Sequence, residues 1–187
     1  WQHLAPGFEI GARFHSAPVI RLVDAKPMQL GHVVEADARW RLFAFAGAGD
    51  SAGPGGDMGA LCNFLGGPGD ALLRRFTPAD ADPDSLIDVR AVFQHYHRDL
   101  DIGVMPEVLR PAKGRLGLRD MEKAFCVDAR QGDIYTMRGV DRERGCMVIV
   151  RPDQYVSHVL PLDAHDALTR FFDGFMLRRD THGCAAV

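Results

Sequence analysis

One run of apolar residues constrains the fold more than any other feature of this 187-residue chain. Residues 146–150 read CMVIV, without the alternation of apolar and polar side chains that marks a strand with one solvent-exposed face. The next four residues, 151–154 (RPDQ), have turn chemistry, because proline presets φ at the second turn position. Residues 155–160 are expected to return as the partner strand. The chain is therefore predicted to form a sheet that is covered on both faces.

The remaining elements indicate an α/β sandwich. A wide apolar stripe at the helical period predicts a C-terminal helix over residues 164–176, with Asp163 as its N-cap and Gly174 at a close packing contact. Further strands are expected where aromatic and β-branched residues lie between turn residues, at 18–24, 28–34, 39–46 and 85–93. Further helices are expected at 58–65, 70–76 and 118–125.

Composition and charge exclude several classes of protein. The chain is 47% hydrophobic and 25% charged, which is typical of a globular domain. Its formal net charge of −3 offers no basic surface for nucleic acid or anionic lipid. No apolar run approaches the roughly 20 residues of a membrane span, and no signal segment opens the chain. We therefore expect a soluble, cytoplasmic domain without nucleic-acid or membrane partners.

The four cysteines do not form a redox or zinc motif. Cys62, Cys126, Cys146 and Cys184 are widely spaced, so neither a CxxC pair nor a paired-cysteine zinc knuckle is present. Cys62 and Cys146 are interpreted as small core residues, because cysteine is among the most often buried residue types. Cys184, near the C-terminus, is interpreted as incidental.

A glycine-rich stretch at 47–69 is only weakly suggestive of a dinucleotide site. Gly47-Ala48-Gly49 follows a predicted strand, but the third glycine of the fingerprint, Gly53, stands one position too late, and the loop continues beyond it. The stretch is interpreted as a mobile loop with a short helix.

Other polar groups also fall short of a catalytic or metal site. His95 and His97 share a face on an extended segment and precede Asp99 and Asp101, but a metal site needs a third ligand. Several other residues have no catalytic pattern around them: Ser51, Ser85, the adjacent Ser157 and His158, and the first-turn acids Asp163 and Asp166. No catalytic, cofactor-binding or metal-ligating residue is assigned.

Three segments carry a resemblance to a known family. Residues 16–32, 39–47 and 146–177 resemble the C-terminal domain of phenol hydroxylase-type, FAD-dependent aromatic monooxygenases, and the match extends from about Gly7 to about Leu177. The resemblance implies a thioredoxin-like sandwich: a central mixed sheet with flanking helices, extra N-terminal strands and a long insertion at 94–140. No CxxC follows the strand at 39–46, and residues 133–145, which lead into the strand at 146–150, contain no proline.

The resemblance also implies a function. In such enzymes FAD, NAD(P)H and a phenolic substrate, of the phenol or 3-hydroxybenzoate type, are handled by a larger N-terminal portion. Residues 1–17 would then connect to that missing flavin domain, 18–177 would form the thioredoxin-like domain and 178–187 a tail. The chain would hold no cofactor, be inactive alone, pack on the flavin domain and support a homodimer.

Two alternatives stay open. The first is a stand-alone thioredoxin-like thiol enzyme that uses Cys62 or Cys126, which requires a thiol of lowered pKa. The second is a binding module that uses the loop at 47–69 or the pair His95 and His97.

Overall fold

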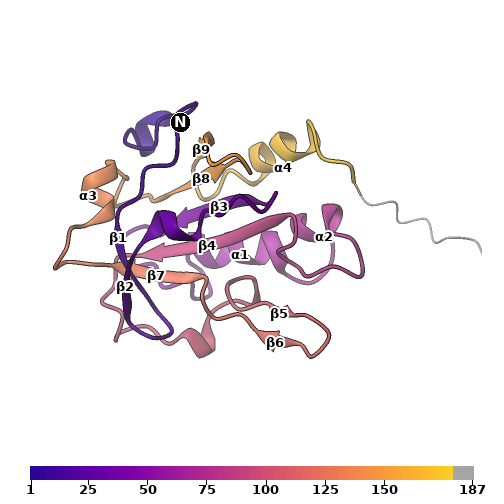
Figure 1. The fold of residues 1–187 in the computed structure, drawn as a ribbon, viewed down its shortest axis with the longest axis horizontal. Helices are drawn as coiled ribbons and strands as arrows, with labels where there is room; N and C mark the ends of the chain where they lie inside the picture. The colour runs from indigo at the N-terminus through magenta and orange to yellow at the C-terminus, as the bar shows by residue number, and fades with distance from the viewer. Residues whose placement is uncertain (179–187) are drawn as a thin grey trace, which may run out of the picture.

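A seven-stranded mixed sheet forms the centre of the protein in the computed structural model, which describes residues 1–178 (Figure 1). The strand order is β2-β1-β7-β4-β3-β8-β9, and a separate two-stranded ribbon pairs β5 with β6. β4 is parallel to β3 and β7, and the other pairs are antiparallel. The strands are β1 (Pro18–Arg21), β2 (Lys26–Gln29), β3 (Trp40–Phe45), β4 (Ile87–Phe93), β5 (Ala112–Lys113), β6 (Leu118–Arg119), β7 (Ala124–Val127), β8 (Cys146–Val150) and β9 (Val156–Leu160).

Short helices cover both faces of this sheet. The α-helices are α1 (Asp57–Gly66), α2 (Leu72–Phe76), α3 (Ile134–Arg138) and α4 (His165–Asp173). The 3₁₀ helices are η1 (Gln2–Leu4), η2 (Leu30–Val33), η3 (Ile102–Val104) and η4 (Glu107–Leu109).

Two apolar cores lie on opposite faces of the sheet. In β3, Leu42 belongs to the core under α1, α2 and α4, whereas Phe43 belongs to the core under the N-terminal segment and α3. The same alternation runs through β8, where Met147 and Val148 face different cores and every residue of the CMVIV run is 0% exposed. The predicted doubly covered strand is therefore confirmed, and with it the α/β layering.

The helix predicted at residues 118–125 is wrong. Leu118 belongs to the short ribbon strand β6, and residues 124–127 form β7, which lies between β1 and β4 in the central sheet. Part of the predicted insertion thus supplies a central strand. The physical reason is tertiary: the backbone groups of β7 gain ladder hydrogen bonds on both sides, which outweighs local helix propensity.

The C-terminal helix exists but differs at both ends. α4 begins at His165 with Ala164 as its N-cap, and Asp163 contributes only a carbonyl that accepts from the His165 amide (2.8 Å). Gly174 is the C-cap, and a Cβ there would meet its nearest atom, the Phe171 carbonyl oxygen, at an ordinary 3.4 Å. The predictions of an Asp163 cap and of a close packing contact at Gly174 are therefore wrong.

Other boundaries moved by a few residues. The strand predicted over 18–24 ends at Arg21, and residues 22–25 form a turn. Lys26 and Pro27 then open β2, an edge strand in which a proline interrupts no central ladder. Of the strand predicted over 28–34, only residues 28 and 29 belong to β2, and residues 30–33 form the 3₁₀ helix η2. α3 was not predicted at all.

The N-terminal segment packs on the sheet. Leu4, Phe8 and Phe14 are buried in the core shared with β8 and β9. Of the predicted tail at 178–187, only Arg178 is described, so Cys184 lies outside the described residues.

Candidate functional site

The glycine-rich loop follows β3 at the carboxyl ends of the parallel strands, the edge where α/β sheets usually bind ligands. Here the N-terminus of α1 is occupied from within the chain. One oxygen of the Asp50 carboxylate accepts a hydrogen bond from the Ala52 amide (2.8 Å), and the other accepts from the Met58 amide (2.8 Å). A phosphate would meet a negative charge and an amide that is already used. The arrangement therefore argues against the dinucleotide interpretation.

The same edge of the sheet is filled by a buried tyrosine. Tyr135 of α3 is 1% exposed, and its hydroxyl lies 2.8 Å from the carbonyl oxygens of Ala46 and Val92, just beyond β3 and within β4. Burial raises the pKa of Tyr135 well above its usual value. It is therefore a neutral packing residue. Sequence reasoning missed it, because only the folded chain brings residue 135 to residues 46 and 92.

The three described cysteines are core residues, as predicted for Cys62 and Cys146. Cys62 is 3% exposed, Cys126 and Cys146 are 0% exposed, and none is in a disulfide. Burial raises the pKa of each thiol to about 12. A thiol enzyme needs a thiolate near neutral pH, so these environments oppose the thiol alternative.

The remaining sequence candidates are not assembled into a site. Among residues 1–178, no three His, Cys, Asp or Glu side chains are grouped to hold a metal ion, and the His97 ring instead lies against Tyr96, with ring centroids 4.4 Å apart and the planes tilted by 57°. Among the hydrogen bonds of residues 1–178, none joins Ser157 to His158. Asp163 and Asp166 are exposed.

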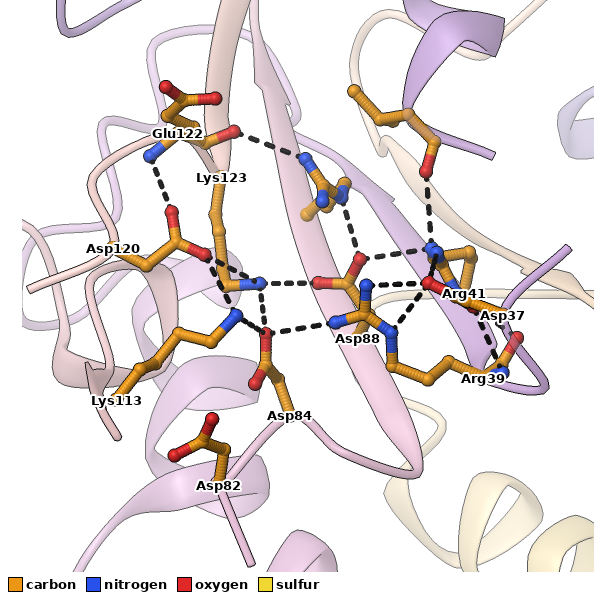
Figure 2. A network of polar contacts seen from close by, with 12 residues as sticks. Asp37, Arg39, Arg41, Asp82, Asp84, Asp88, Lys113, Asp120, Glu122 and Lys123 are labelled. Carbon is orange, nitrogen blue, oxygen red and sulfur yellow. Dashed lines mark hydrogen bonds and ion pairs between the residues drawn. The ribbon is translucent and has the colours of Figure 1, made fainter. Parts of the chain in front are cut away.

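The densest polar cluster lies at the opposite edge, where the parallel strands begin (Figure 2). Lys123 is 0% exposed, and its ammonium contacts Asp84 (2.5 Å), Asp88 (2.6 Å) and Asp120 (3.4 Å). Lys113, from β5, reaches the same Asp84 oxygen at 3.0 Å.

Arginines complete this cluster on the β3 side. Arg41 is 1% exposed and pairs with Asp88 (3.0 Å) and with Asp37 (2.7 Å). Arg39 also binds Asp37 (2.6 Å), and Arg90 also binds Asp88 (2.8 Å). The ion network therefore ties the loop before β3 to the beginnings of β3, β4 and β7.

The charges in this network are fixed by their partners. Burial alone would raise the pKa of Asp84, but the hydrogen bonds and attraction of Lys123 and Lys113 outweigh it and lower the pKa to about 2. The pKa of Asp37 is also lowered, because its bonds to Arg41 and Arg39 outweigh burial. Each buried charge thus has a partner of opposite sign. The network is therefore interpreted as a structural one that holds the strand ends together, rather than as a reactive site. The network is not among the candidates expected from the sequence, although Asp88 and Arg90 inside an apolar strand are a visible signal of it.

Fold and site together define a thioredoxin-like domain that lacks the redox cysteine pair. The structure resembles a thiol:disulfide interchange protein from Bacteroides sp. with a TM-score of 0.53 and 10% identity, covering 90% of this chain and 93% of that one. Residues 1–180 match the sequence profile of the phenol hydroxylase C-terminal dimerisation domain. The chain belongs to this family.

Curated relatives are much longer than this chain. It is 51% identical over 177 residues to 3-hydroxybenzoate 4-monooxygenase of Comamonas testosteroni, covering 94% of this chain and 28% of that protein. It is 31% identical over 185 residues to the FAD-dependent monooxygenase terD of Aspergillus terreus, covering 95% and 30% respectively. The chain thus spans less than a third of the length of these relatives.

Within the described residues no helix could cross a bilayer, since the longest, α1, has 10 residues against the roughly 20 of a span.

Proposed function

We propose that this chain is the noncatalytic C-terminal domain of an FAD- and NAD(P)H-dependent aromatic-ring hydroxylase. It packs on the flavin-binding part of the same polypeptide and supports a homodimer. The observation that carries the proposal is the family match over residues 1–180, reinforced by 51% identity to a monooxygenase of which this chain covers 28%.

The interior of the domain supports a structural role. The edge of the sheet where ligands usually bind holds the Asp50 cap and the buried Tyr135, and the described thiols have raised pKa values. FAD and NAD(P)H are therefore assigned to the parent enzyme, and no cofactor to this chain.

The proposal extends to the layout and setting of the parent. Residues 1–17 lead in from the flavin-binding part and pack on the sheet of the thioredoxin-like domain of residues 18–177, and residues 178–187 form the tail. The parent hydroxylates a substrate of the phenol or 3-hydroxybenzoate type in the cytoplasm, and a net charge of −3 supports the assignment of no nucleic-acid partner.

The test compares this chain with the polypeptide that contains it. The purified chain is expected to show no flavin absorbance, no hydroxylation of phenol or 3-hydroxybenzoate, and by light scattering a mass of twice the 20.6 kDa of one chain. The longer polypeptide is expected to bind FAD and to hydroxylate the ring. Stoichiometric FAD in the isolated chain, or a longer polypeptide without FAD, would refute the proposal.

A further inference from the structure

A continuous row of aromatic side chains lies on one face of the domain. Trp1 lies 6.4 Å from His158 between ring centroids, and His158 lies 5.5 Å from Phe171. Phe175 continues the row, at 5.3 Å from Phe171 and 4.8 Å from Trp40. We call these five residues the aromatic face.

The aromatic face is partly open to solvent. Trp1 is 52% exposed and Phe175 is 49% exposed. Leu177, two residues beyond Phe175, is 91% exposed. Scattered apolar side chains are ordinary on a protein surface, whereas adjoining exposed aromatics mark an interaction site.

The face is held rigidly by the core beneath it. Leu168 and Phe172 of α4 are both 0% exposed and anchor the helix in the core below. That anchoring leaves Phe171 of α4 only partly buried, and Phe175 follows just beyond the helix. Burial lowers the pKa of His158, so its ring is neutral at neutral pH. The face therefore presents fixed, uncharged rings, which lose little entropy on binding.

A shallow hollow in the face is suited to receive a side chain. It has a volume of about 510 Å³ and is lined by Trp40, Phe171, Phe175, Ser157 and the β8–β9 turn. The turn supplies an Arg151–Asp153 ion pair (2.5 Å) at the edge of the hollow. An apolar centre with a polar rim is the usual anatomy of a protein–protein contact.

The chain enters the domain at this face. Trp1 belongs to the face, η1 lies beside β9 and α4 is close by (Figure 1). Leu4 is 0% exposed, and its carbonyl accepts from the backbone amide of Asp141 (2.8 Å). The side-chain amide nitrogen of Gln2 donates to the Ala5 and Phe8 carbonyls (3.0 Å each). The point of entry is therefore fixed rather than carried on a loose tether.

We propose that the aromatic face is the docking surface for the flavin-binding part that precedes Trp1 in the same polypeptide. This inference rests on the proposed function and adds the location of the contact. Because the chain enters at the face, the preceding part is covalently held beside it at a high effective concentration, which a second copy does not share. The dimer contact is thereby assigned to another surface.

The test uses the full-length polypeptide with two variants, Phe175→Ser in the aromatic face and Leu177→Ser two residues beyond Phe175. Leu116→Ser is the matched control for the leucine variant, because Leu116 is 79% exposed in the distant β5–β6 turn. Three properties are measured: the mass by light scattering, the rate of limited proteolysis between the two parts, and the unfolding of each part, followed by flavin fluorescence and circular dichroism.

The Phe175→Ser variant is expected to stay dimeric, to be cleaved between the parts about tenfold faster, as losing an interface anchor implies, and to unfold in two separated steps. Leu177→Ser should act in the same direction, and Leu116→Ser should match the wild type. Hydrogen exchange should show residues 171–177 protected in the full-length protein relative to the isolated chain.

Three results would overturn the proposal. One is a monomeric Phe175→Ser protein whose parts still unfold together, since the face would then bind a second copy. Another is a Phe175→Ser or Leu177→Ser protein indistinguishable from Leu116→Ser. The third is a full-length protein without FAD, which would remove the proposed function as well.

Discussion

At the scale of single residues, the most demanding positions are the buried charges at the N-terminal ends of the parallel strands. Lys123 and Asp88 are both 0% exposed, and Arg41 is 1% exposed. Such charges are tolerated only when opposite charges and hydrogen bonds replace the lost water. Asp88 meets Lys123 through one oxygen and Arg41 through the other, so both of its oxygens have partners.

Removing the buried ammonium should therefore be costly. Lys123→Met leaves Asp84 and Asp88 short of a partner in the interior and is expected to lower the free energy of unfolding by about 3–5 kcal/mol. Lys113→Met, whose side chain is 28% exposed, should cost under about 1 kcal/mol. Urea denaturation followed by circular dichroism measures both, and equal effects of the two substitutions would contradict the assigned role of Lys123.

Acid should weaken the fold through the same carboxylates. The pKa of Asp84 is lowered from 3.8 to about 2. A carboxylate whose pKa is lower in the folded state stabilises the fold at any pH above its unfolded pKa, and that stabilisation is lost as the pH falls toward its folded pKa. The pKa values of Asp37 and Asp120 are lowered as well. The urea midpoint is therefore expected to fall steeply as the pH drops from 3.8 to about 2.

The control for this pH dependence is Asp84→Asn, which cannot titrate at that position. Its midpoint will be lower at neutral pH, but it should fall less steeply over the same acid range. A wild-type midpoint that is flat in acid would show that the network does not contribute as described.

At the scale of elements, local sequence predicts whether a segment is a helix or a strand better than it predicts the residues at which that helix or strand ends. α1 was expected at 58–65 and forms at Asp57–Gly66, because its apolar residues recur at the helical period. Its N-cap contact was invisible in the sequence, since Asp50 lies eight positions before the Met58 amide that it binds. The start of β7 falls within a predicted helix for a similar reason, because its partners β1 and β4 are distant in the chain.

The Asp50 contact gives a prediction for α1. Asp50→Ala removes the acceptor for the Ala52 and Met58 amides and should lower the free energy of unfolding by about 1 kcal/mol. Asp57→Ala is the matched control, because Asp57 is an exposed first-turn acid whose side chain caps no amide; its loss should cost about 0.5 kcal/mol. Chemical denaturation of the two variants decides, and an Asp50→Ala variant as stable as the wild type would refute the capping role.

At the scale of the whole molecule, two apolar cores lie on opposite faces of one sheet and share its strands. Cys62 and Cys126 lie in one core and Cys146 in the other, on strands or helices from three parts of the chain. Because β3, β4 and β8 contribute residues to both cores, loss of one core exposes the strands that hold the other. The domain is therefore expected to unfold as a single cooperative unit.

Thiol labelling measures that cooperativity directly. In a Cys184→Ser background, which removes the thiol outside the described residues, Cys62, Cys126 and Cys146 should resist a thiol reagent in native buffer. All three should then become reactive at the same urea concentration, coincident with the loss of circular dichroism. Early labelling of Cys146 alone would show that the two cores open separately.

Neighbouring residues in the sequence are enough to specify the layering of this protein, the strands β3, β4 and β8, and the family resemblance. Those features depend on apolar periodicity over neighbouring residues, as in the CMVIV run of β8. The ion network around Lys123, the place of Tyr135, the position of β7 and the aromatic face that includes Trp1 are set by tertiary contacts. Each of these joins residues distant in the chain, and the free energy that selects them comes from pairing, burial and desolvation in the folded state, which local sequence does not encode.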